Sequence, residues 1–385
     1  MSRNNWHRSL TIVINLFRVI VAFVFLFSGF VKATDPIGTA IKLQEYCTSF
    51  GIGFLTQDNS LLVILALALA VVEFILGVYM LLGIYRFGST MTLLVLMTVL
   101  TPFTLYVAIT NPVSDCGCFG DAVHLTNWQT FAKNVVLLFM VIMVACCRKR
   151  IIPFVTSLTD GLISAVTMFL IITYSVYNVY HLPLLDFRPY REGVNLQEKV
   201  LLESDADFLN FWVSDSAGND CTQELLEHQG YSFILVSDFL EDFDYTNYDR
   251  VTDLIEYTRS YGYRFVILTS SESAVVEQWR QEMDPNVEFM SADDAMLKTI
   301  IRSNPGLVIL KDGRIMSKFS SSDIPKDDVL IASVDSIDIL NADRILALPT
   351  WAYVLFYMLV PFMVIGLINV GIVVFRRYKE KNKQT

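Results

Sequence analysis

Charged side chains are scarce in this chain of 385 residues. They make up 18% of the sequence, against about 25% in ordinary soluble domains, while hydrophobic residues make up 54%. Histidine is rarer still, with four residues, and the chain contains no Cys-x-x-Cys and no His-x-x-x-His. The composition therefore argues against a soluble protein, and the missing motifs leave a metal site with little support.

Basic residues are few in the long segment 181–350, the part of the chain that could form a soluble domain. The net charge of the chain is −10, and residues 181–350 hold 31 of its 39 acidic residues but only 14 of its 29 basic ones. Nucleic acid requires a basic surface, so we do not expect it as a partner. The acidic segment is expected to be a well-solvated domain outside the lipid.

Long apolar runs, by contrast, are abundant. A helix needs about 20 apolar residues to cross the hydrocarbon core of a bilayer. Six segments meet this requirement: 10–31, 61–84, 90–109, 129–147, 161–180 and 351–375. The first run has no Ala-x-Ala cleavage site before the sequence TDP, so we expect it to be retained as a helix. The sequence thus predicts a polytopic α-helical membrane protein that spans the lipid bilayer several times.

Lysine and arginine in short loops predict the orientation, because they resist translocation. Eleven of them fall at the two ends of the chain, at position 86 and at 148–150, whereas the other face has only Lys32 and Lys42 in loop 32–60. Both termini are therefore expected in the cytoplasm. The loop 110–128 and residues 181–350 then lie outside, in the periplasm, and the protein is expected in a bacterial inner membrane.

The chain is accordingly divided into four parts. Residues 1–150 are expected to form a four-helix transmembrane domain, and residues 151–180 a fifth transmembrane helix. Residues 181–350 form the exported domain. Residues 351–385 form a sixth helix with a basic cytoplasmic tail.

The exported domain alternates predicted strands and helices. Short apolar runs predict strands at 231–238, 263–270 and 287–291, and helical patterns lie at about 248–261, 272–283 and 293–303. Two further apolar runs are separated by the sequence KDG at 311–313, which is typical of a β-hairpin. This order predicts an α/β domain with parallel strands, finished by an antiparallel hairpin.

The order of elements resembles the thioredoxin fold. In that family a cis proline borders the active site, which the resemblance implies for Pro305. The family also has a Cys-x-x-Cys where the helix after the first central strand begins, but residues 237–248 contain no cysteine. The resemblance thus implies a thioredoxin-like domain without its dithiol. Cys221 lies upstream of this position and is either an isolated thiol or a relay thiol.

The sequence SDCGCFGD places Cys116 and Cys118 in the predicted outer loop. Exported compartments are oxidising, so we expect the pair to form or exchange a disulfide. A ring closed across Gly117 alone gains little from the loop-entropy term that stabilises structural disulfides, which favours redox exchange. Two alternatives remain: a structural disulfide or inert thiols, and a soft-metal site. Further ligands for a metal would be Asp115, Asp121, His124 and Cys47.

Three other cysteines lie in the membrane part. Cys47 is predicted on the outer face and is either unpaired or a relay thiol for the pair. Cys146 and Cys147 lie at the cytoplasmic end of the fourth span and are expected to be packing residues or acylation sites. Thiolate reactivity depends on positive potential, and Lys133 is the nearest candidate source for the outer pair.

Two charged residues, Arg18 and Glu73, lie deep inside the predicted spans. At a rise of 1.5 Å per residue, the depths of Arg18 and Glu73 differ by about 5 Å, and charges within a membrane tend to be paired. We therefore expect an ion pair between them. A role in proton transfer, or in holding a quinone head group, is the alternative.

The sequence DCGCFGDAVHLTNWQTFAKNVVLL, with SGFVKATDP at 28–36 and Glu73, resembles the DoxX-like/MauE group of bacterial four-helix membrane proteins. The resemblance covers about residues 10–147. Members resembling MauE are associated with disulfide formation or redox maturation of exported proteins, and the architecture resembles quinone-coupled thiol oxidases of the vitamin K epoxide reductase type. The resemblance implies that Cys116 and Cys118 are the redox pair.

Two functions are therefore considered. The first is an inner-membrane thiol–disulfide oxidoreductase, in which Cys116 and Cys118 exchange electrons with an exported client or a thioredoxin-like protein. No cofactor motif is evident, and a quinone is the acceptor that the resemblance implies. The second is a non-catalytic membrane scaffold or anchor whose exported domain binds an envelope partner.

Overall fold

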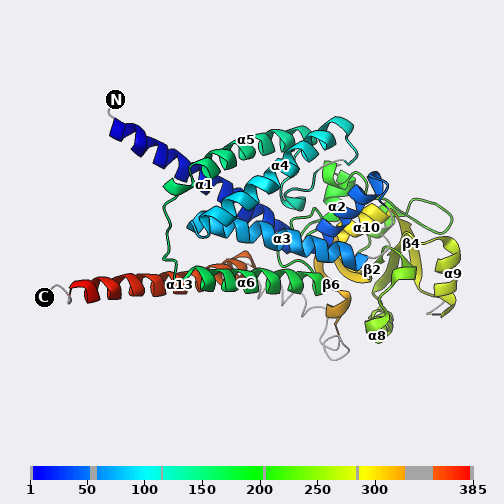
Figure 1. Ribbon diagram of the computed structural model, residues 1–385. Helices are drawn as coiled ribbons and strands as arrows, with labels where there is room; N and C mark the ends of the chain where they lie inside the picture. Colours follow the sequence, from blue (N-terminus) through cyan, green and yellow to red (C-terminus); the bar gives the residue numbers. More distant parts are fainter. Residues whose placement is uncertain are drawn as a thin grey trace. The chain divides into compact units, whose positions relative to one another are not determined.

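The computed structural model describes residues 3–52, 59–113, 116–202, 205–282, 286–325 and 350–381. The chain divides into two compact units, and each is described by itself (Figure 1). The first unit comprises Met1–Val179 and Trp351–Thr385, and the second comprises Tyr180–Thr350.

Six helices among the described residues are long and apolar enough to cross a membrane, by length and composition. They are α1 (Arg3–Thr34), α3 (Asn59–Leu82), α4 (Arg86–Thr110), α5 (Asn127–Cys146), α6 (Asp160–Tyr180) and α13 (Thr350–Lys381). The prediction of six apolar helices is therefore confirmed. Their orientation in a membrane stays a prediction.

The first unit also contains a shorter helix, α2 (Pro36–Ser49), within the segment 32–60 that the sequence predicts as a loop. The Asp35 carboxylate accepts a hydrogen bond from the backbone nitrogen of Gly38 at 2.8 Å, so Asp35 caps this helix. Pro36 occupies the first turn, where its missing N–H costs nothing. The start of α2 directly after α1 also defines where α1 ends.

Two glycines allow α1 and α3 to approach closely. A Cβ atom on Gly29 would lie 2.8 Å from the Cα atom of Phe74, and one on Gly77 would lie 2.7 Å from the backbone nitrogen of Leu26. Both distances are shorter than real carbon contacts, so the contact requires glycine at both positions. The C-terminal half of α1 is thereby held against α3.

The helix α6 packs against the end of α1. The hydroxyl groups of Thr34 and Tyr174 lie 3.0 Å apart, and Asn178 Nδ2 donates to the carbonyl oxygen of Ala33 at 3.1 Å. The rings of Phe30 and Tyr174 are stacked with centroids 5.6 Å apart. The fifth span is thus attached to the four-helix part by polar and aromatic contacts.

The second unit is built on a six-stranded sheet in the order β1-β4-β3-β2-β5-β6. The strands are β1 (Val213–Ser214), β2 (Tyr231–Ser237), β3 (Arg264–Thr269), β4 (Glu288–Ala292), β5 (Gly306–Lys311) and β6 (Arg314–Ser320). The pairs β2–β3 and β3–β4 are parallel, whereas β1–β4, β2–β5 and β5–β6 are antiparallel. The sheet is therefore mixed and ends in an antiparallel hairpin.

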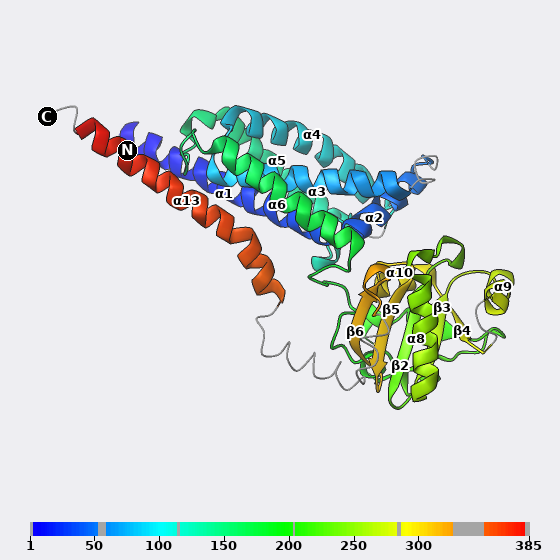
Figure 2. The same cartoon turned by 90° about the horizontal axis from the view of Figure 1, so that it is seen from below.

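Alternating apolar residues of the strands bury both faces of this sheet. Phe233 and Leu235 of β2 face a core that includes α8 (Tyr248–Tyr261) and α9 (Ser273–Glu282). Ile234 and Val236 face a second core that includes α7 (Thr222–Leu226) and α10 (Asp294–Ile300). Figure 2 shows α8 lying along the sheet.

The predicted strands and helices of this unit are confirmed, except that one helix is shorter than predicted and that α7 and β1 were not predicted. The helix expected at 293–303 ends at Ile300, because the chain turns extended at Ile301 before the strand β5. The strand β1 was not predicted, since two residues are too short for a periodic signal. The assignment to the thioredoxin fold stays a prediction.

Candidate functional site

The loop between α4 and α5 carries the Cys-Gly-Cys sequence. Its second described part begins at Cys116 and is turned by two glycines, with φ of +63° at Gly117 and +48° at Gly120. The backbone N–H of Gly120 donates to the carbonyl oxygen of Gly117 at 3.1 Å. Glycine adopts positive φ without strain, so the chain can turn sharply between and just after the two cysteines.

Three side chains hold the backbone of this loop. Ser28 Oγ and Lys32 Nζ, both from α1, donate to the carbonyl oxygen of Cys118 at 2.8 and 2.9 Å. The Tyr46 hydroxyl, from α2, donates to the carbonyl oxygen of Cys116 at 3.3 Å. Two helices that lie far from the loop in sequence therefore fix the position of both cysteines.

The two cysteines are free thiols in this structure, and their Sγ atoms lie 2.8 Å apart. A hydrogen bond from the Cys116 thiol lowers the pKa of Cys118 to about 6; burial opposes this shift, and the charges of Lys133 and Lys32 add to it. The same hydrogen bond, together with burial, raises the pKa of Cys116. Cys118 is therefore the thiolate near neutral pH, and Cys116 is its protonated partner.

A buried ion pair lies next to Cys118. Lys32 Nζ is 2.8 Å from Glu73 Oε2, and the two residues are 5% and 6% exposed. The ammonium group also donates to Ser28 Oγ at 2.7 Å and to the carbonyl oxygen of Cys118 at 2.9 Å. All three N–H groups of Lys32 are thus hydrogen-bonded, as a charge at this burial requires.

This pair corrects the expected ion pair between Arg18 and Glu73. Arg18 instead donates to the carbonyl oxygen of Ile152 at 2.6 Å, and its guanidinium carbon lies 4.8 Å from the ring centroid of Phe154. The sequence reasoning placed Lys32 in an outer loop, but α1 continues past it, and Lys32 belongs to the last helical turn. Lys32 therefore pairs with Glu73, while Arg18 is hydrogen-bonded to the segment that contains Ile152.

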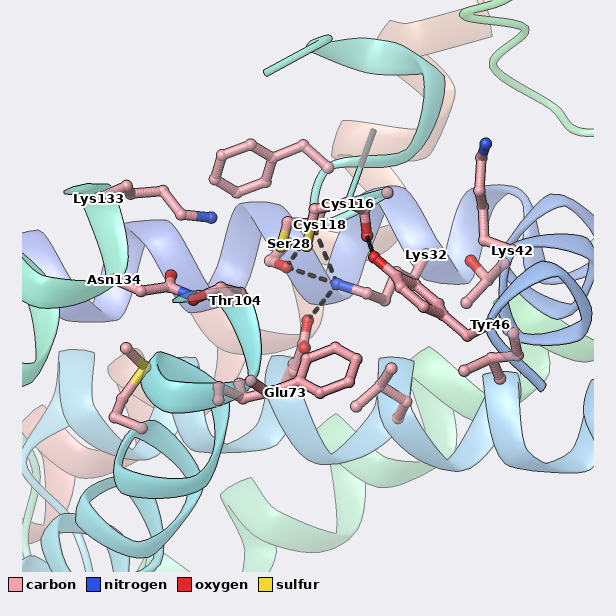
Figure 3. A pocket seen from close by; sticks show the side chains of 18 of the residues that line it. Ser28, Lys32, Lys42, Tyr46, Glu73, Thr104, Cys116, Cys118, Lys133 and Asn134 are labelled. Atoms are coloured by element: carbon pink, nitrogen blue, oxygen red, sulfur yellow. Dashed lines mark hydrogen bonds and ion pairs between the residues drawn. The ribbon is translucent and has the colours of Figure 1, made fainter. Parts of the chain in front are cut away.

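The cysteine pair and the ion pair line one cavity of about 340 Å³ (Figure 3). Its walls come from α1, α2, α3, α4, α5 and the cysteine loop. Much of the lining is apolar, and it includes Phe25, Leu69, Met97, Leu100, Phe103 and Leu137. The thiols thus line a largely apolar cavity between the helices and the cysteine loop.

A second polar group lines the cavity from α4 and α5. Asn134 Nδ2 donates to Thr104 Oγ1 at 3.2 Å, and Lys133 Nζ lies 4.2 Å from the centroid of the Phe119 ring. Figure 3 shows the ammonium group of Lys133 directed toward the cysteines. The cavity therefore combines apolar walls with a few hydrogen-bonding groups, as small-molecule sites do.

The remaining cysteines lie at separate places. Cys47 lines the same cavity and packs in a small cluster with Ala40, Leu62 and Ala66. Cys221 belongs to the second unit, where it directly precedes α7. Cys146 and Cys147 are at the end of α5. The roles of Cys47 and Cys221 as relay thiols stay predictions.

A soft-metal site was the other chemistry predicted for the loop. Within the parts of the chain that the structure describes, no three His, Cys, Asp or Glu side chains are grouped so as to hold a metal ion. Of the candidate ligands, Asp115 falls outside the described residues. Asp121 and His124 lie in the loop after the cysteines.

In the second unit, the Asn304–Pro305 peptide bond is cis, as expected. Asn304 joins this segment to the end of β2: Ser237 Oγ donates to Asn304 Oδ1 at 2.6 Å, and Asn304 Nδ2 donates to the carbonyl oxygen of Phe239 at 2.8 Å. The segment 237–248, which follows β2, contains no cysteine. The position next to Pro305 is therefore linked to the end of β2 by hydrogen bonds of Asn304, and segment 237–248 supplies no thiol there.

Comparison with known proteins gives one match. Residues 10–147 match a family model described as methylamine utilisation protein MauE. The match includes the helices α2 to α5, the cysteine loop and most of α1. Neither the curated proteins nor the solved structures give a match to this chain.

Proposed function

We propose that this protein is a membrane thiol–disulfide oxidoreductase in which Cys116 and Cys118 exchange electrons with cysteines of an exported client. One observation carries the proposal. Two free thiols, with Sγ atoms 2.8 Å apart, line the same cavity as the buried pair of Lys32 and Glu73. A pair that served only to shape a loop would not need a low-pKa thiolate beside buried charges.

Cys118, whose pKa of about 6 makes it a thiolate at neutral pH, is the sulfur that leaves when the disulfide of the pair is opened. The oxidised pair accepts electrons when a client thiolate attacks one of its sulfurs and forms a mixed disulfide. A second client thiolate resolves that bond, which leaves an oxidised client and the reduced Cys116–Cys118 pair. A membrane quinone would then take the two electrons from the pair and restore its disulfide.

The match to the MauE family model supports this proposal, because it covers the part of the chain that contains both cysteines. The proposed location is a bacterial inner membrane with both termini in the cytoplasm. In that orientation the cysteine loop and the second unit are outside, where client disulfides form.

The second unit is proposed to be a thioredoxin-like domain that binds the client or a partner. Three features support this: the parallel pair β2–β3 joined through α8, the antiparallel hairpin β5–β6, and the cis bond before Pro305. The domain would then contribute binding and leave the redox step to the first unit.

The alternative is a non-catalytic scaffold, favoured by the lack of a cysteine in segment 237–248. In that case the cysteine loop would only shape the surface of the bundle, and the second unit would recruit an envelope partner. The two functions differ in what the loop cysteines must do.

The test is acid-quenched labelling of native membranes with a mass-tagging maleimide. Wild type and the Cys116→Ser, Cys118→Ser and double variants are compared before and after mild reductant. For a redox enzyme, the pair is found partly oxidised, is reduced by mild thiol, and forms mixed disulfides with clients in Cys116→Ser. A pair that is always oxidised and resists mild reductant would establish the scaffold instead.

A further inference from the structure

We infer that Arg18, Arg86 and Arg148 bind the phosphate group of an anionic phospholipid, at the end of the bundle where α3 joins α4. The cysteine loop joins α4 to α5 and therefore lies at the opposite end of α4. The inference does not depend on the proposed redox function. It starts from Arg18, which does not line the cavity of the cysteine pair.

Arg18 is buried but only partly hydrogen-bonded. The residue is 1% exposed. Its Nη1 donates to the carbonyl oxygen of Ile152 at 2.6 Å, and the ring centroid of Phe154 lies 4.8 Å from its guanidinium carbon. Nε is buried without a hydrogen-bond partner, and no carboxylate among the described residues forms an ion pair with Arg18. A buried charge without a counter-ion is costly, and an anion bound beside it offsets that cost.

The contacts of Arg18 place it at the edge of the membrane. A Cβ atom on Gly83 would lie 2.6 Å from its Nη1, so the guanidinium group lies directly against the turn between α3 and α4. Segment 151–154 is at the same level, because the backbone N–H of Phe154 donates to the carbonyl oxygen of Leu82, the last residue of α3, at 2.9 Å. Turns between membrane helices need hydrogen-bond partners that hydrocarbon lacks. Arg18 is therefore at the depth of the lipid head groups.

Two more arginines surround the start of α4. Arg86 is exposed and is the first residue of α4, and its charge repels that of Arg18. Arg148 lies over the ring of Phe87, with 5.1 Å between the guanidinium carbon and the ring centroid. The charge of Asp160, at the start of α6, acts on Arg86. This carboxylate alone cannot balance three guanidinium groups, so the cluster keeps a net positive charge.

The start of α4 adds backbone donors to the cluster. The residue before the helix, Tyr85, has a φ of +46°, and its side chain makes no capping hydrogen bond. The first N–H groups of a helix lack partners within the helix and favour an anion. Guanidinium groups bind phosphate through two parallel hydrogen bonds. A phosphate group beside Arg18 and Arg86 would thus meet donors from side chains and from the backbone.

The surroundings favour a lipid over a soluble phosphate. Four large side chains flank the arginines and are exposed: Tyr85, Phe87, Ile152 and Phe154. These side chains can contact the glycerol and acyl groups of a phospholipid, whereas inorganic phosphate gains nothing from them. Basic sites between membrane helices are typical binding sites for the head groups of anionic lipids.

The experiment measures lipid binding to the full chain in detergent by native mass spectrometry. Phosphatidylglycerol, which is anionic, is compared with phosphatidylcholine, which has the same phosphate but no net charge. Arg18→Met and Arg86→Gln each remove one charge from the cluster. Lys149→Gln is the matched control, because Lys149 is an exposed basic residue next to Arg148 in the same turn. Excess inorganic phosphate is added as a competitor in a separate arm.

We expect the first phosphatidylglycerol to bind wild type more tightly than phosphatidylcholine. Its affinity should fall at least about tenfold in Arg18→Met and Arg86→Gln, as for the loss of a hydrogen bond to a charged group. Lys149→Gln should lower it by less than about fivefold, the effect of one charge near an anionic surface.

Equal affinity for the two lipids would overturn the inference, and so would equal losses in Arg86→Gln and Lys149→Gln. Displacement of the lipid by inorganic phosphate would show a site for a soluble phosphate and overturn the assignment to a lipid. Because Arg86 is exposed, Arg86→Gln decides the matter even where Arg18→Met does not fold.

Discussion

Lys32 of α1 and Glu73 of α3 meet at 2.8 Å in the interior of the bundle, and the same ammonium group holds the carbonyl oxygen of Cys118 at 2.9 Å. One side chain thus links the contact between two helices to the position of the thiolate. A change at Lys32 is expected to affect stability and thiol chemistry together.

Replacing Lys32 by Met leaves the buried Glu73 carboxylate without its partner. Removal of one member of a buried pair costs about 3–5 kcal/mol, so the free energy of unfolding in mixed micelles should fall by that amount. The double variant Lys32→Met/Glu73→Leu should recover much of the loss, since no unpaired charge remains. Lys42→Met is the control: its pair with Glu45 is 27% and 41% exposed and is worth less than about 1 kcal/mol. Equal losses in both single variants would contradict the prediction.

The alkylation rate of reduced Cys118 should be proportional to the fraction of this thiol that is ionised to the thiolate. With its pKa lowered to about 6, the thiolate is present above that pH and is lost below it. The rate with iodoacetamide should therefore fall about tenfold between pH 7 and pH 5. Cys116→Ala removes the hydrogen bond that lowers this pKa, so the midpoint should move to higher pH. A midpoint near the ordinary value for cysteine in the wild type would refute the assignment of Cys118 as the thiolate.

Lys133→Met tests the electrostatic contribution from α5. The charge of Lys133 lowers the pKa of Cys118, so its removal should shift the alkylation midpoint upward. Lys133→Arg keeps the charge and should leave the midpoint close to that of wild type. If Met and Arg give the same midpoint, Lys133 acts through packing and not through its charge.

Gly29→Ala should destabilise the contact between α1 and α3. The added methyl group would lie 2.8 Å from the Cα atom of Phe74, and overpacking of this kind costs about 1–3 kcal/mol. Gly88→Ala on α4 is the opposite case, because a Cβ there meets nothing within 4 Å. Alanine favours a helix over glycine by up to about 1 kcal/mol, so Gly88→Ala should be neutral or stabilising. Thermal unfolding of the two variants in the same detergent gives the comparison.

The elements that the sequence predicts well have a strong local signal. The membrane helices are long apolar runs, and strands such as β2 are short runs of aromatic and β-branched residues bounded by polar turns. The helix α2 carries a weaker signal, but Asp35 and Pro36 are a typical start of a helix and could have revealed both α2 and the true end of α1.

The candidate site was predicted only in part. Cys116 and Cys118 stand out by spacing alone, whereas Ser28, Lys32 and Tyr46 are recognised only when α1 and α2 are placed against the loop. The partner of Glu73 depends on which face of α1 packs against α3. Similar depth in the membrane, which was the basis for expecting Arg18, does not determine which faces meet. The cavity arises from side-chain packing among five helices and has no counterpart in a linear pattern.

The order of synthesis gives the position of Lys32 a further consequence. Lys32 precedes Glu73 by 41 residues and Cys118 by 86. The ion pair can therefore form while the ribosome is still making the segment that contains the cysteines. A lysine that enters the bilayer with α1 is neutralised by the next long helix to be inserted. The nascent cysteine loop then arrives at hydrogen-bond donors of α1 and α2 that are already in place, before the helices α5, α6 and α13 are made.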